Sequence, residues 1–519
     1  MRVLFYNWVD YLDDEGRGGG VSLYQRNLMT ALDAEGDIEA VFLSAGISHD
    51  LIARMPRWER VRHGPATDRA RRFEIVNSGT LSPSHHSFGN PAQLSHPATV
   101  AAFRDFVART GPYDVIHFNN LEGLPAEVLA LGDEWPGTRM ILMLHNYYPV
   151  CPQVNLWHRE RENCTDYADG RKCVDCLPFK PDERLVRGAN AVAFTLKKRG
   201  IRPGTRTFDR LFRPALGIGV RAGRFAARLA RRLRRAPAPT DPAIAAPPQP
   251  DATPFAERRA AMVRLINTHC HRVLCVSQRV GEVAARHGIA PGLLETAYIG
   301  TAQAEKFAAT APRDAMTGAD GTLTLAFLGY MRRDKGFYFL LDALEALPAE
   351  TAARIRLVVA AGAREPETLE RLHALGSRLA GLRHLDGYSH DGLDDLLAGV
   401  DVGVVPVLWE DNLPQVAIEM HARHIPLLTS DLGGAQELGN CPAMVFRAGD
   451  AADFAARLKA ILAGAISPEA YWRDAMAPTS MTAHLAQLRA VYGAPAATPA
   501  PAQARERASG CGSGAGISA

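Results

Sequence analysis

The sequence predicts an α/β protein with two doubly wound, Rossmann-like domains that face a common cleft, and with an Arg-rich helical and linker insertion in the first domain. Two observations favour this fold class. Continuous apolar runs alternate with helical patterns in two separate blocks of the chain, and such runs are typical of parallel strands covered on both faces. The length of 519 residues also exceeds that of one ordinary domain, while 47% hydrophobic and 22% charged residues are ordinary globular values.

The first block opens on an apolar run, a glycine-rich loop (EGRGGG) and a helical pattern from residue 21 to about 32. The stretch from 46 to about 95 is rich in His, Pro, Ser and Arg, and we expect loops and short elements there. Apolar and β-branched runs in this block predict strands over 2–7, 38–44, 114–118 and 138–145.

The second block begins near residue 320 and repeats the alternation, with helical patterns such as GFYFLLDALEAL between its apolar runs. The runs predict strands over 323–330, 354–362, 382–388, 401–407, 425–430 and 443–447. In open α/β sheets, ligands bind beyond the carboxyl ends of the strands, and a cleft lies between two such domains. Residues that directly follow the strands are therefore the first candidates for a functional site.

These patterns divide the chain into a first domain over 1–310, with an insertion over 150–255, and a second domain over 311–475. A C-terminal helix is expected over 476–492. Within the insertion, RRAPAPTDPAIAAPPQPDATP is rich in Pro and Ala, which predicts a mobile linker. The tail over 493–519 is expected to be disordered for the same compositional reason.

Composition and charge exclude several classes of protein. No apolar run approaches the roughly 18 residues that span a bilayer, and the start MRVLFYNWVD predicts a core strand and not a signal peptide. We therefore expect a cytosolic chain whose eight cysteines are reduced, metal-bound or inert. The formal net charge of +3 does not indicate a nucleic-acid binder.

One segment is nevertheless strongly basic, since residues 202–235 contain eleven arginines and one acid. Within 216–235, Phe225, Leu229 and Leu233 recur every four residues between arginines, which predicts a cationic amphipathic helix. Such a helix either lies in an anionic membrane interface or packs on the domain with its arginines in solvent. Both interpretations stay open, while nucleic acid is not expected as a partner.

A group of cations follows the first strand of the second block. In GYMRRDKGF, Arg332, Arg333 and Lys335 come after the strand, and Gly336 opens a helix. Cations beside a helix N-terminus predict an anion site, because the backbone N–H groups and the helix dipole point the same way. A solvated turn is the alternative.

The stretch WEDNLPQVAIE places Asp411 and Glu419 eight residues apart around a helix start. Asp411 or Asn412 is expected to cap this helix, with Pro414 in its first turn. The free N–H groups from Leu413 onward are then expected to hold a phosphate, and Glu419 to accept hydrogen bonds from the two hydroxyls of a ribose. The alternative gives Asp411 a capping role only and leaves Glu419 in solvent.

A paired-glycine turn follows the next strand. SDLGGAQEL places Gly433 and Gly434 before Glu437, and paired glycines let a backbone approach a ligand closely. A simple tight turn is the alternative.

The N-terminal block carries two further candidates. Gly18, Gly19 and Gly20 lead into a helix, but without the G-x-G-x-x-G spacing of nicotinamide-cofactor loops or the Lys-Ser/Thr of a Walker loop. His145 ends a predicted strand in MLHNYYP, where it faces the expected cleft.

In their order, these motifs resemble those of the retaining glycosyltransferases of family four, the glycosyltransferase group 1 type with the GT-B architecture of two Rossmann-like domains. The chain carries GGG at 18–20, His145, RRDKG, DNLPQVAIE and GGAQE where that family has its glycine loop, histidine, Arg/Lys pair, paired acids and GGxxE turn. The resemblance covers about 1–160 and 255–490. The first paired acid departs from the family, because Asp411 stands where the family has Glu, unless Glu410 takes its place with a slip of one residue.

The resemblance implies transfer of a sugar from a nucleotide diphosphate sugar to an acceptor hydroxyl, with retention at the anomeric carbon and without a catalytic metal. It implies that residues 1–310 hold the acceptor and 311–475 the nucleotide sugar. The catalytic residues that it implies are His145, Asp411, Glu419 and Lys335. The donor-binding residues that it implies are Gly18, Gly19, Gly20, Arg332, Arg333, Asn412, Leu413, Gly433, Gly434 and Glu437.

We therefore expect a hexosyltransferase-type enzyme of polysaccharide or glycolipid biosynthesis, with a glycan or lipid-linked acceptor, in the cytoplasm or peripheral on the cytoplasmic face of a membrane. One rival is a catalytically weak sugar-nucleotide-binding protein on the same fold, which the shorter Asp411 suggests. Another is a membrane- or partner-binding scaffold, which the basic segment 216–235 suggests. The donor base, the sugar, the acceptor and the linkage stay open.

Four cysteines gather in the insertion as Cys151, Cys164, Cys173 and Cys176, the last two spaced C-x2-C. Four thiolates suit a tetrahedral zinc ion, and a zinc ion here would be structural. The alternative is a set of inert or partly oxidised thiols.

Overall fold

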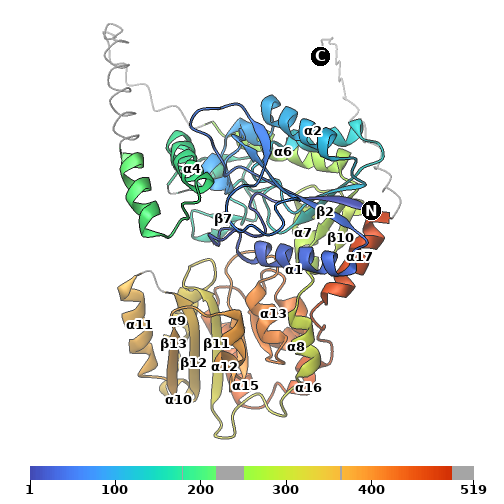
Figure 1. Cartoon of the computed structure of the whole chain (residues 1–519). Coiled ribbons are helices and arrows are strands. Elements are labelled where there is room, and N and C mark those ends of the chain that lie inside the picture. The colour runs from blue at the N-terminus through green and yellow to red at the C-terminus, as the bar shows by residue number, and fades with distance from the viewer. Residues whose placement is uncertain (178, 218–250, 363–364, 494–519) are drawn as a thin grey trace, which may run out of the picture.

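The computed structural model describes residues 1–177, 179–217, 251–362 and 365–493. It shows two α/β domains, each built on its own sheet of largely parallel strands. In Figure 1 the N-terminal domain, coloured blue to green, lies above the C-terminal domain, coloured yellow to orange. The alternation of strands and helices predicted for the two blocks is observed in both domains.

The N-terminal domain is built on an eight-stranded sheet in the order β10-β9-β6-β5-β1-β2-β4-β3. Its pairs are parallel except β3 with β4, which is antiparallel. The sheet consists of β1 (Arg2–Tyr6), β2 (Glu39–Ala45), β3 (Arg57–Arg60), β4 (Arg72–Val76), β5 (Val115–Phe118), β6 (Arg139–Leu144), β9 (Arg272–Cys275) and β10 (Leu294–Thr296). A small separate hairpin in the insertion pairs β7 (Trp157–His158) with β8 (Glu162–Asn163).

Helices cover both faces of this sheet (Figure 1). They are α1 (Gly19–Glu35), α2 (Pro97–Thr110), α3 (Arg171–Val174), α4 (Glu183–Lys198), α6 (Thr253–His269), α7 (Gln278–Arg286) and α8 (Gln303–Ala309), the last lying against the C-terminal domain. Short 3₁₀ segments are η1 (Ser84–Ser87), η2 (Pro91–Gln93), η3 (Ala126–Glu134) and η4 (Pro291–Leu293). Helix α1 lies along the lower edge of the domain, where it faces the second domain.

The C-terminal domain is built on a six-stranded, wholly parallel sheet in the order β13-β12-β11-β14-β15-β16. Its strands are β11 (Leu323–Tyr330), β12 (Ile355–Gly362), β13 (Gly381–Leu385), β14 (Val402–Val405), β15 (Leu427–Ser430) and β16 (Val445–Phe446). Its helices are α9 (Phe337–Glu345), α10 (Ala349–Ala352), α11 (Pro366–Gly376), α12 (Leu393–Leu397), α13 (Gln415–His421), α14 (Gln436–Gly439), α15 (Ala451–Leu462) and α16 (Pro468–Trp472), with 3₁₀ segments η5 (His390–Gly392) and η6 (Pro442–Met444). Central strands are almost fully buried because helices cover both faces.

The last helix, α17 (Met481–Gly493), leaves the C-terminal domain and packs on α1 of the N-terminal domain. Its Tyr492 hydroxyl lies 2.6 Å from Nδ1 of His117 in β5, and its His484 Nε2 lies 2.8 Å from the Tyr24 hydroxyl of α1. The chain therefore crosses between the domains twice. The packing of α17 on α1 helps to fix the position of one domain relative to the other.

Two parts of the N-terminal sheet were not predicted from the sequence. Strand β4 was missed because its sequence RFEIV contains Arg72 and Glu74, which are buried nonetheless. Arg72 forms an ion pair with Asp10 at 2.9 Å, and Glu74 accepts hydrogen bonds from His63 and Ser48. Strands β9 and β10 were missed because they are short and lie after the insertion.

The predicted amphipathic helix within 216–235 lies almost wholly outside the described residues, as does the tail after residue 493. Within the described ranges, no helix combines the length and the apolar character that crossing a membrane requires.

Candidate active site

A cavity of about 860 Å³ lies between the two domains. The N-terminal domain contributes the loop before α1, the first turns of that helix and the residue that follows β6. The C-terminal domain contributes the ends of β11, β12 and β14, the residues after β13 and the start of α13. The cavity therefore lies at the carboxyl ends of strands from both sheets, which is the place that this kind of fold offers for a ligand.

The structure brings most of the predicted site residues to this cavity. Those that line it are Gly18, Gly19, Gly20, His145, Lys335, Asp411, Asn412, Leu413 and Glu419. Those that do not line it are Arg332, Arg333, Gly433, Gly434 and Glu437. Lys335 and Glu419 are thus on one surface, although 83 residues separate them in the sequence.

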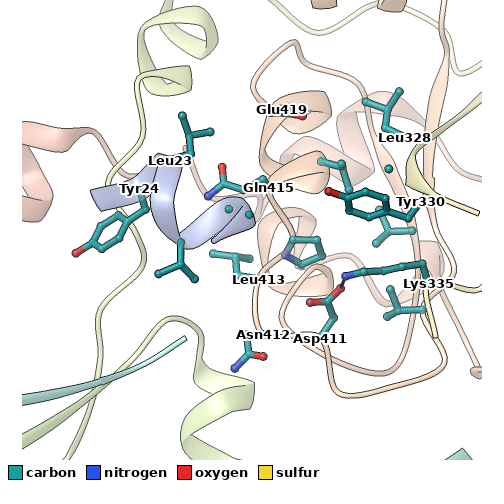
Figure 2. A pocket seen from close by; sticks show the side chains of 18 of the residues that line it. Leu23, Tyr24, Leu328, Tyr330, Lys335, Asp411, Asn412, Leu413, Gln415 and Glu419 are labelled. Atoms are coloured by element: carbon teal, nitrogen blue, oxygen red, sulfur yellow. Dashed lines mark hydrogen bonds and ion pairs between the residues drawn. The ribbon is translucent and has the colours of Figure 1, made fainter. Parts of the chain in front are cut away.

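Lys335 and Asp411 form an ion pair on the C-terminal wall, with Nζ and Oδ2 2.6 Å apart (Figure 2). Lys335 comes from the turn after β11 and Asp411 from the loop between β14 and α13. Gly336, at φ 72°, takes the left-handed conformation that this turn requires, and a Cβ there would lie 1.7 Å from the Pro406 carbonyl oxygen. The Trp409 ring packs 5.1 Å from the Lys335 nitrogen and leaves the ammonium group partly exposed to the cavity.

Glu419 is deeply buried and still lines the cavity. Its carboxylate accepts a hydrogen bond from the Tyr388 hydroxyl at 2.8 Å and lies 3.3 Å from the His390 Nε2 atom. Burial raises the pKa of Glu419, while Tyr388 and His390 act in the opposite direction. The interpretation of Glu419 as a solvated helix residue is therefore wrong.

The glycine loop forms the opposite wall at the start of α1. A Cβ on Gly18 would lie 1.7 Å from the Ser22 Oγ atom, and Gly19 has φ 53°, so both positions favour glycine. A Cβ on Gly20 would lie 3.0 Å from Cγ of Gln415, which belongs to the other domain. Figure 2 shows the Gln415 amide directed toward α1. The loop therefore brings its backbone close to the Gln415 side chain of the C-terminal domain, with no side chain of its own at Gly20.

His145 follows β6 and is held in a neutral form. Burial and then the charge of His484 lower the pKa of His145 to about 3. Its Nε2 atom lies 3.3 Å from Oδ1 of Asn119, and its ring packs 5.0 Å from the Tyr24 ring. A neutral imidazole at the edge of the cavity can exchange hydrogen bonds with a ligand hydroxyl without adding charge.

The prediction that Asp411 or Asn412 caps the following helix is wrong. Helix α13 begins at Gln415 and Pro414 is its N-cap residue, with no side-chain cap hydrogen bond. Asp411 instead binds Lys335, and the Asn412 carbonyl accepts a hydrogen bond from Ser277 of the N-terminal domain at 2.7 Å. Among the described residues, the buried Nδ2 atom of Asn412 has no hydrogen-bond partner, so one donor of the loop is unused.

The paired glycines support the Asp411 loop from behind. Gly433 has φ 75°, and a Cβ there would lie 2.1 Å from the Asp411 carbonyl oxygen. The Gly434 N–H donates to that same oxygen at 2.9 Å. These glycines therefore allow close packing of two loops, and it is the Asp411 loop that reaches the cavity.

Glu437 contacts the other domain. Its carboxylate accepts hydrogen bonds from the backbone N–H groups of Gln278 and Arg279, at the start of α7, and from the Tyr298 hydroxyl at 2.7 Å. An acid at a helix N-terminus is stabilised by the free N–H groups and the helix dipole. In this structure Glu437 thus joins the two domains and does not face the cavity.

Glu410 also joins the domains. Its contacts decide whether Glu410 or Asp411 is the first acid of the pair that ends at Glu419. Its buried carboxylate forms ion pairs with Arg279 at 2.7 Å and Arg286 at 3.3 Å, both from α7. Burial acts to raise the pKa of Glu410, but Arg279 outweighs it and holds the pKa below its ordinary value. Glu410 and Asp411 therefore point to different partners, and Asp411 is the acid at the cavity.

The two arginines before Lys335 lie outside the cavity lining. Arg332 forms an ion pair with Asp334 at 2.9 Å and is more than half exposed. The Arg333 guanidinium lies 5.6 Å above the Tyr338 ring. Of the three predicted cations, Lys335 alone lines the cavity.

Several aromatic or basic residues of the cavity were not singled out from the sequence, among them Tyr330, Tyr388 and His390. Tyr388 and His390 hold Glu419, and Tyr330 lies at the end of β11 with its ring over the cavity (Figure 2). All three follow or end a strand, so the rule that ligands bind beyond strand ends would have found them.

The four cysteines of the insertion lie apart from this cavity. All are free thiols, and all four line one separate small cavity together with Arg259. No three of their sulfur atoms lie within 4.8 Å of one another; among the described residues that closeness is found only for ligand atoms of Asp13, Asp14 and Glu15.

Comparisons with known proteins address the fold and the C-terminal domain. Residues 322–464 match the family model described as "Glycosyl transferases group 1", and no curated protein matches the sequence at a significant level. The solved HepE protein of Anabaena, in complex with UDP, aligns with TM-score 0.51 and 13% identity over 94% of this chain and 98% of its own.

Two further solved structures also align over nearly the whole chain. A sucrose-phosphate synthase from Thermosynechococcus elongatus aligns with TM-score 0.51 and 16% identity over 95% of this chain and 98% of its own. An apo structure of OtsA aligns with TM-score 0.50 and 11% identity over 95% and 99%. The chain has the GT-B fold. Residues 322–464 of its C-terminal domain match the glycosyltransferase group 1 model, and the cavity lies between the two domains of that fold.

Proposed function

We propose that the protein is a retaining glycosyltransferase that moves a sugar from a nucleotide diphosphate sugar to a glycan or lipid-linked acceptor. One observation carries the proposal. Lys335, the Asp411 loop and Glu419 converge on one interdomain cavity, opposite a wall of glycine backbone. This arrangement offers a cation for phosphate, a buried carboxylate for a diol and a close backbone approach in the same place.

The charge of the leaving group is the main requirement of such a reaction. As the bond between the anomeric carbon and the phosphate oxygen breaks, negative charge develops on the nucleoside diphosphate. Lys335 is a fixed cation at the cavity. The loop of Asn412 and Leu413 lines the same cavity, and the proposal assigns its backbone N–H groups to the diphosphate. Preorganised donors of this kind stabilise developing charge without reorganisation, and the proposal assigns them this role in place of a metal ion.

In the proposed step, the acceptor oxygen forms the new bond to the anomeric carbon on the face that the phosphate leaves. The departing phosphate oxygen takes the proton of the acceptor hydroxyl. This front-face route retains the anomeric configuration and needs no covalent intermediate on the protein. Neutral His145 is assigned to a hydroxyl of the donor sugar near the reacting carbon, as its position at the cavity edge allows.

Glu419 is assigned to the ribose of the nucleotide. Tyr388 and His390 fix its carboxylate inside the cavity, so its oxygens are oriented before a ligand binds. Asp411 is assigned to the donor sugar, although its side chain is a methylene shorter than the glutamate of the family it resembles. Its ion pair with Lys335 couples the sugar contact to the phosphate contact.

The acceptor assignment rests on the basic segment. The basic, amphipathic sequence within 216–235 fits an anionic membrane surface, and a lipid-linked acceptor would be presented there. A role in polysaccharide or glycolipid biosynthesis, peripheral on the cytoplasmic face of a membrane, follows as part of this proposal.

The first test is nucleotide binding by the full chain. Thermal unfolding with UDP, GDP and ADP should identify one base by a rise in unfolding temperature, since a ligand of the native state stabilises it. UDP is the first choice because HepE was solved with UDP. Stabilisation by none of the three would contradict the proposal.

The second test is turnover with sugars carried on the selected nucleotide. Release of nucleoside diphosphate, followed by NMR of the anomeric proton in the product, should show transfer with retention. An inverted product would overturn the retaining mechanism. Binding without any transfer or slow donor hydrolysis would favour the rival of a sugar-nucleotide-binding protein.

A further inference from the structure

The insertion between β6 and α4 brings four cysteines together from separate short elements. Cys151 lies in the turn after β6, Cys164 follows β8, Cys173 lies in α3 and Cys176 just after it. All four line one cavity of about 10 Å³. That volume is about the size of one water-sized sphere, so the cavity suits a single ion and not an organic ligand.

The thiols are chemically available for an ion. All four are free, and three of them are buried, as are the neighbouring Phe88 and Trp157. Four thiolates form the ligand set of structural zinc sites, with tetrahedral geometry and no open position. Neither the donor cavity nor any residue assigned to it touches this place.

A buried cation at the same cavity points independently to a missing negative charge. Arg259 of α6 is only 8% exposed and lines the cavity with the four cysteines. Its guanidinium packs 3.4 Å above the Tyr167 ring and lies 3.4 Å from His287 Nδ1, and no carboxylate in the described part of the chain pairs with it. A buried charge without a counter-charge is costly, whereas a zinc ion with four thiolates carries a net charge of −2.

We propose that Cys151, Cys164, Cys173 and Cys176 bind one structural zinc ion, and that Arg259 offsets one of the two negative charges of the zinc–thiolate centre. Binding converts four thiols to thiolates and releases four protons, and zinc changes no oxidation state. A zinc–sulfur bond of about 2.3 Å requires neighbouring sulfurs about 3.8 Å apart, so the sulfurs must draw together. The Cys176 thiol donates to Gln153 Oε1 at 2.9 Å, and that hydrogen bond is given up when the sulfur turns to the metal.

The zinc ion would fix the insertion against the interdomain contact. A neighbouring cavity of about 300 Å³ is lined by Cys164 and Arg259 on one side and by Arg286 and Glu410 on the other. Glu410 forms the ion pairs with Arg279 and Arg286 that join the two domains, so the insertion adjoins this interdomain contact. The next residue, Asp411, lines the donor cavity. The role is structural, so it stands whether or not the protein transfers a sugar.

The test is metal content of the full chain produced with zinc in the medium. Elemental analysis should find about one zinc per chain in the wild type, as a closed four-thiolate site predicts. Cys173→Ser and Cys176→Ser should each lose most of it, while Cys441→Ser, a free cysteine outside the cavity, should keep it. A chain without zinc, or zinc kept in both cavity variants, would overturn the proposal.

Cobalt provides a readout that does not depend on the folding of cysteine variants. Exchange of the wild-type metal for Co²⁺ should give thiolate-to-metal charge transfer and the intense visible bands of a tetrahedral ion. An octahedral spectrum without thiolate bands would place the metal on oxygen ligands and contradict the assignment.

The role of Arg259 has its own test. Arg259→Met should weaken zinc retention against a chelator by about 10- to 100-fold, the usual effect of losing a partner of the ligands, and Arg259→Lys should restore part of it. Retention unchanged by Arg259→Met would refute the charge argument.

Discussion

The C-terminal wall of the donor cavity carries charged side chains that already have partners, whereas the N-terminal wall brings glycine backbone and a neutral histidine to the cavity, beside Asp13 and Arg26. On the first wall, Lys335 pairs with Asp411, and Glu419 is held by Tyr388 and His390. On the second, Gly18 to Gly20 begin α1 and His145 is kept uncharged by burial. The difference separates two tasks: Lys335, Asp411 and Glu419 supply charge on one wall, and the glycine loop supplies a close backbone approach on the other.

This division explains why substitutions on the two walls should differ in kind. Removing a charge from the C-terminal wall leaves its former partner buried and alone, which adds a penalty to the lost ligand contact. Changing the N-terminal wall alters the fit between backbone surfaces. The predictions that follow test this contrast in order of expected size.

The largest effect is expected at Lys335. Lys335→Met should lower turnover by about 10²–10³-fold, the range seen when one preorganised donor to a developing charge is removed. Arg332→Met is the matched control, because Arg332 precedes the same helix but lies outside the cavity. Initial rates of nucleoside diphosphate release measure both. Equal losses in the two variants would show that general basicity, and not the position of Lys335, matters.

The next effect is expected at Glu419. Glu419→Gln keeps the size of the side chain but replaces a charged acceptor, so nucleoside diphosphate should bind about 10- to 100-fold more weakly, as hydrogen bonds to charged groups are worth about 1.5–3 kcal/mol. Calorimetric titration gives the dissociation constant. A 2′,3′-dideoxy nucleotide should bind both proteins alike; if the variant still binds it more weakly, Glu419 does not act on the ribose.

A smaller effect concerns His484 of α17, which contacts Tyr24 behind the N-terminal wall. Burial lowers the pKa of His484 to about 4, so between pH 6.5 and pH 4 the unfolded state binds more protons than the native state. Native stability must therefore fall as the pH falls through this window, by about 2 kcal/mol at pH 5 for this one histidine.

Urea unfolding at pH 7 and pH 5 tests this expectation. His484→Gln removes the Tyr24 contact and costs some stability at both values, but its loss between pH 7 and pH 5 should be about 2 kcal/mol smaller than that of the wild type. An identical pH dependence in both proteins would mean that folding does not lower the pKa of His484.

The sequence predicted the C-terminal domain more fully than the N-terminal one, and the reason is physical. Strands of a wholly parallel, doubly covered sheet are continuous apolar runs, so β11 was predicted over the same residues that it occupies. Strand β4 contains Arg72 and Glu74, whose partners Asp10 and His63 lie 62 and 11 residues away in the sequence and outside the strand. No local pattern shows that such charges are buried.

The same limit applied to the site. Lys335 and Asp411 were placed in one cleft because each follows a strand, and Glu419 because it lies about one turn into the helix that follows Asp411. Glu410 and Glu437 could not be assigned from sequence, because their partners belong to α7 of the other domain. Adjacent acids at 410 and 411 look alike in a motif, and only the docking of the domains separates their roles.

The smallest effect distinguishes two glycines of the N-terminal wall. Gly18→Ala should destabilise the protein by about 1 kcal/mol or more, because the new Cβ meets Ser22 and Val9, at 1.7 and 2.6 Å, inside the packed first turn of α1. Gly20→Ala meets only the side chain of Gln415 at 3.0 Å, which can move aside, and should leave stability nearly unchanged.

Nucleotide binding then sharpens the contrast within this pair. Gly20 faces the other domain across the cavity, so Gly20→Ala should weaken nucleoside diphosphate binding modestly, by about fivefold for a penalty of about 1 kcal/mol, in a protein of normal stability. Gln415→Ala removes the atom that the new Cβ meets and should restore binding in the double variant. If the double variant still binds nucleoside diphosphate weakly, the loss comes from a change in the backbone of the glycine loop and not from the clash with Gln415.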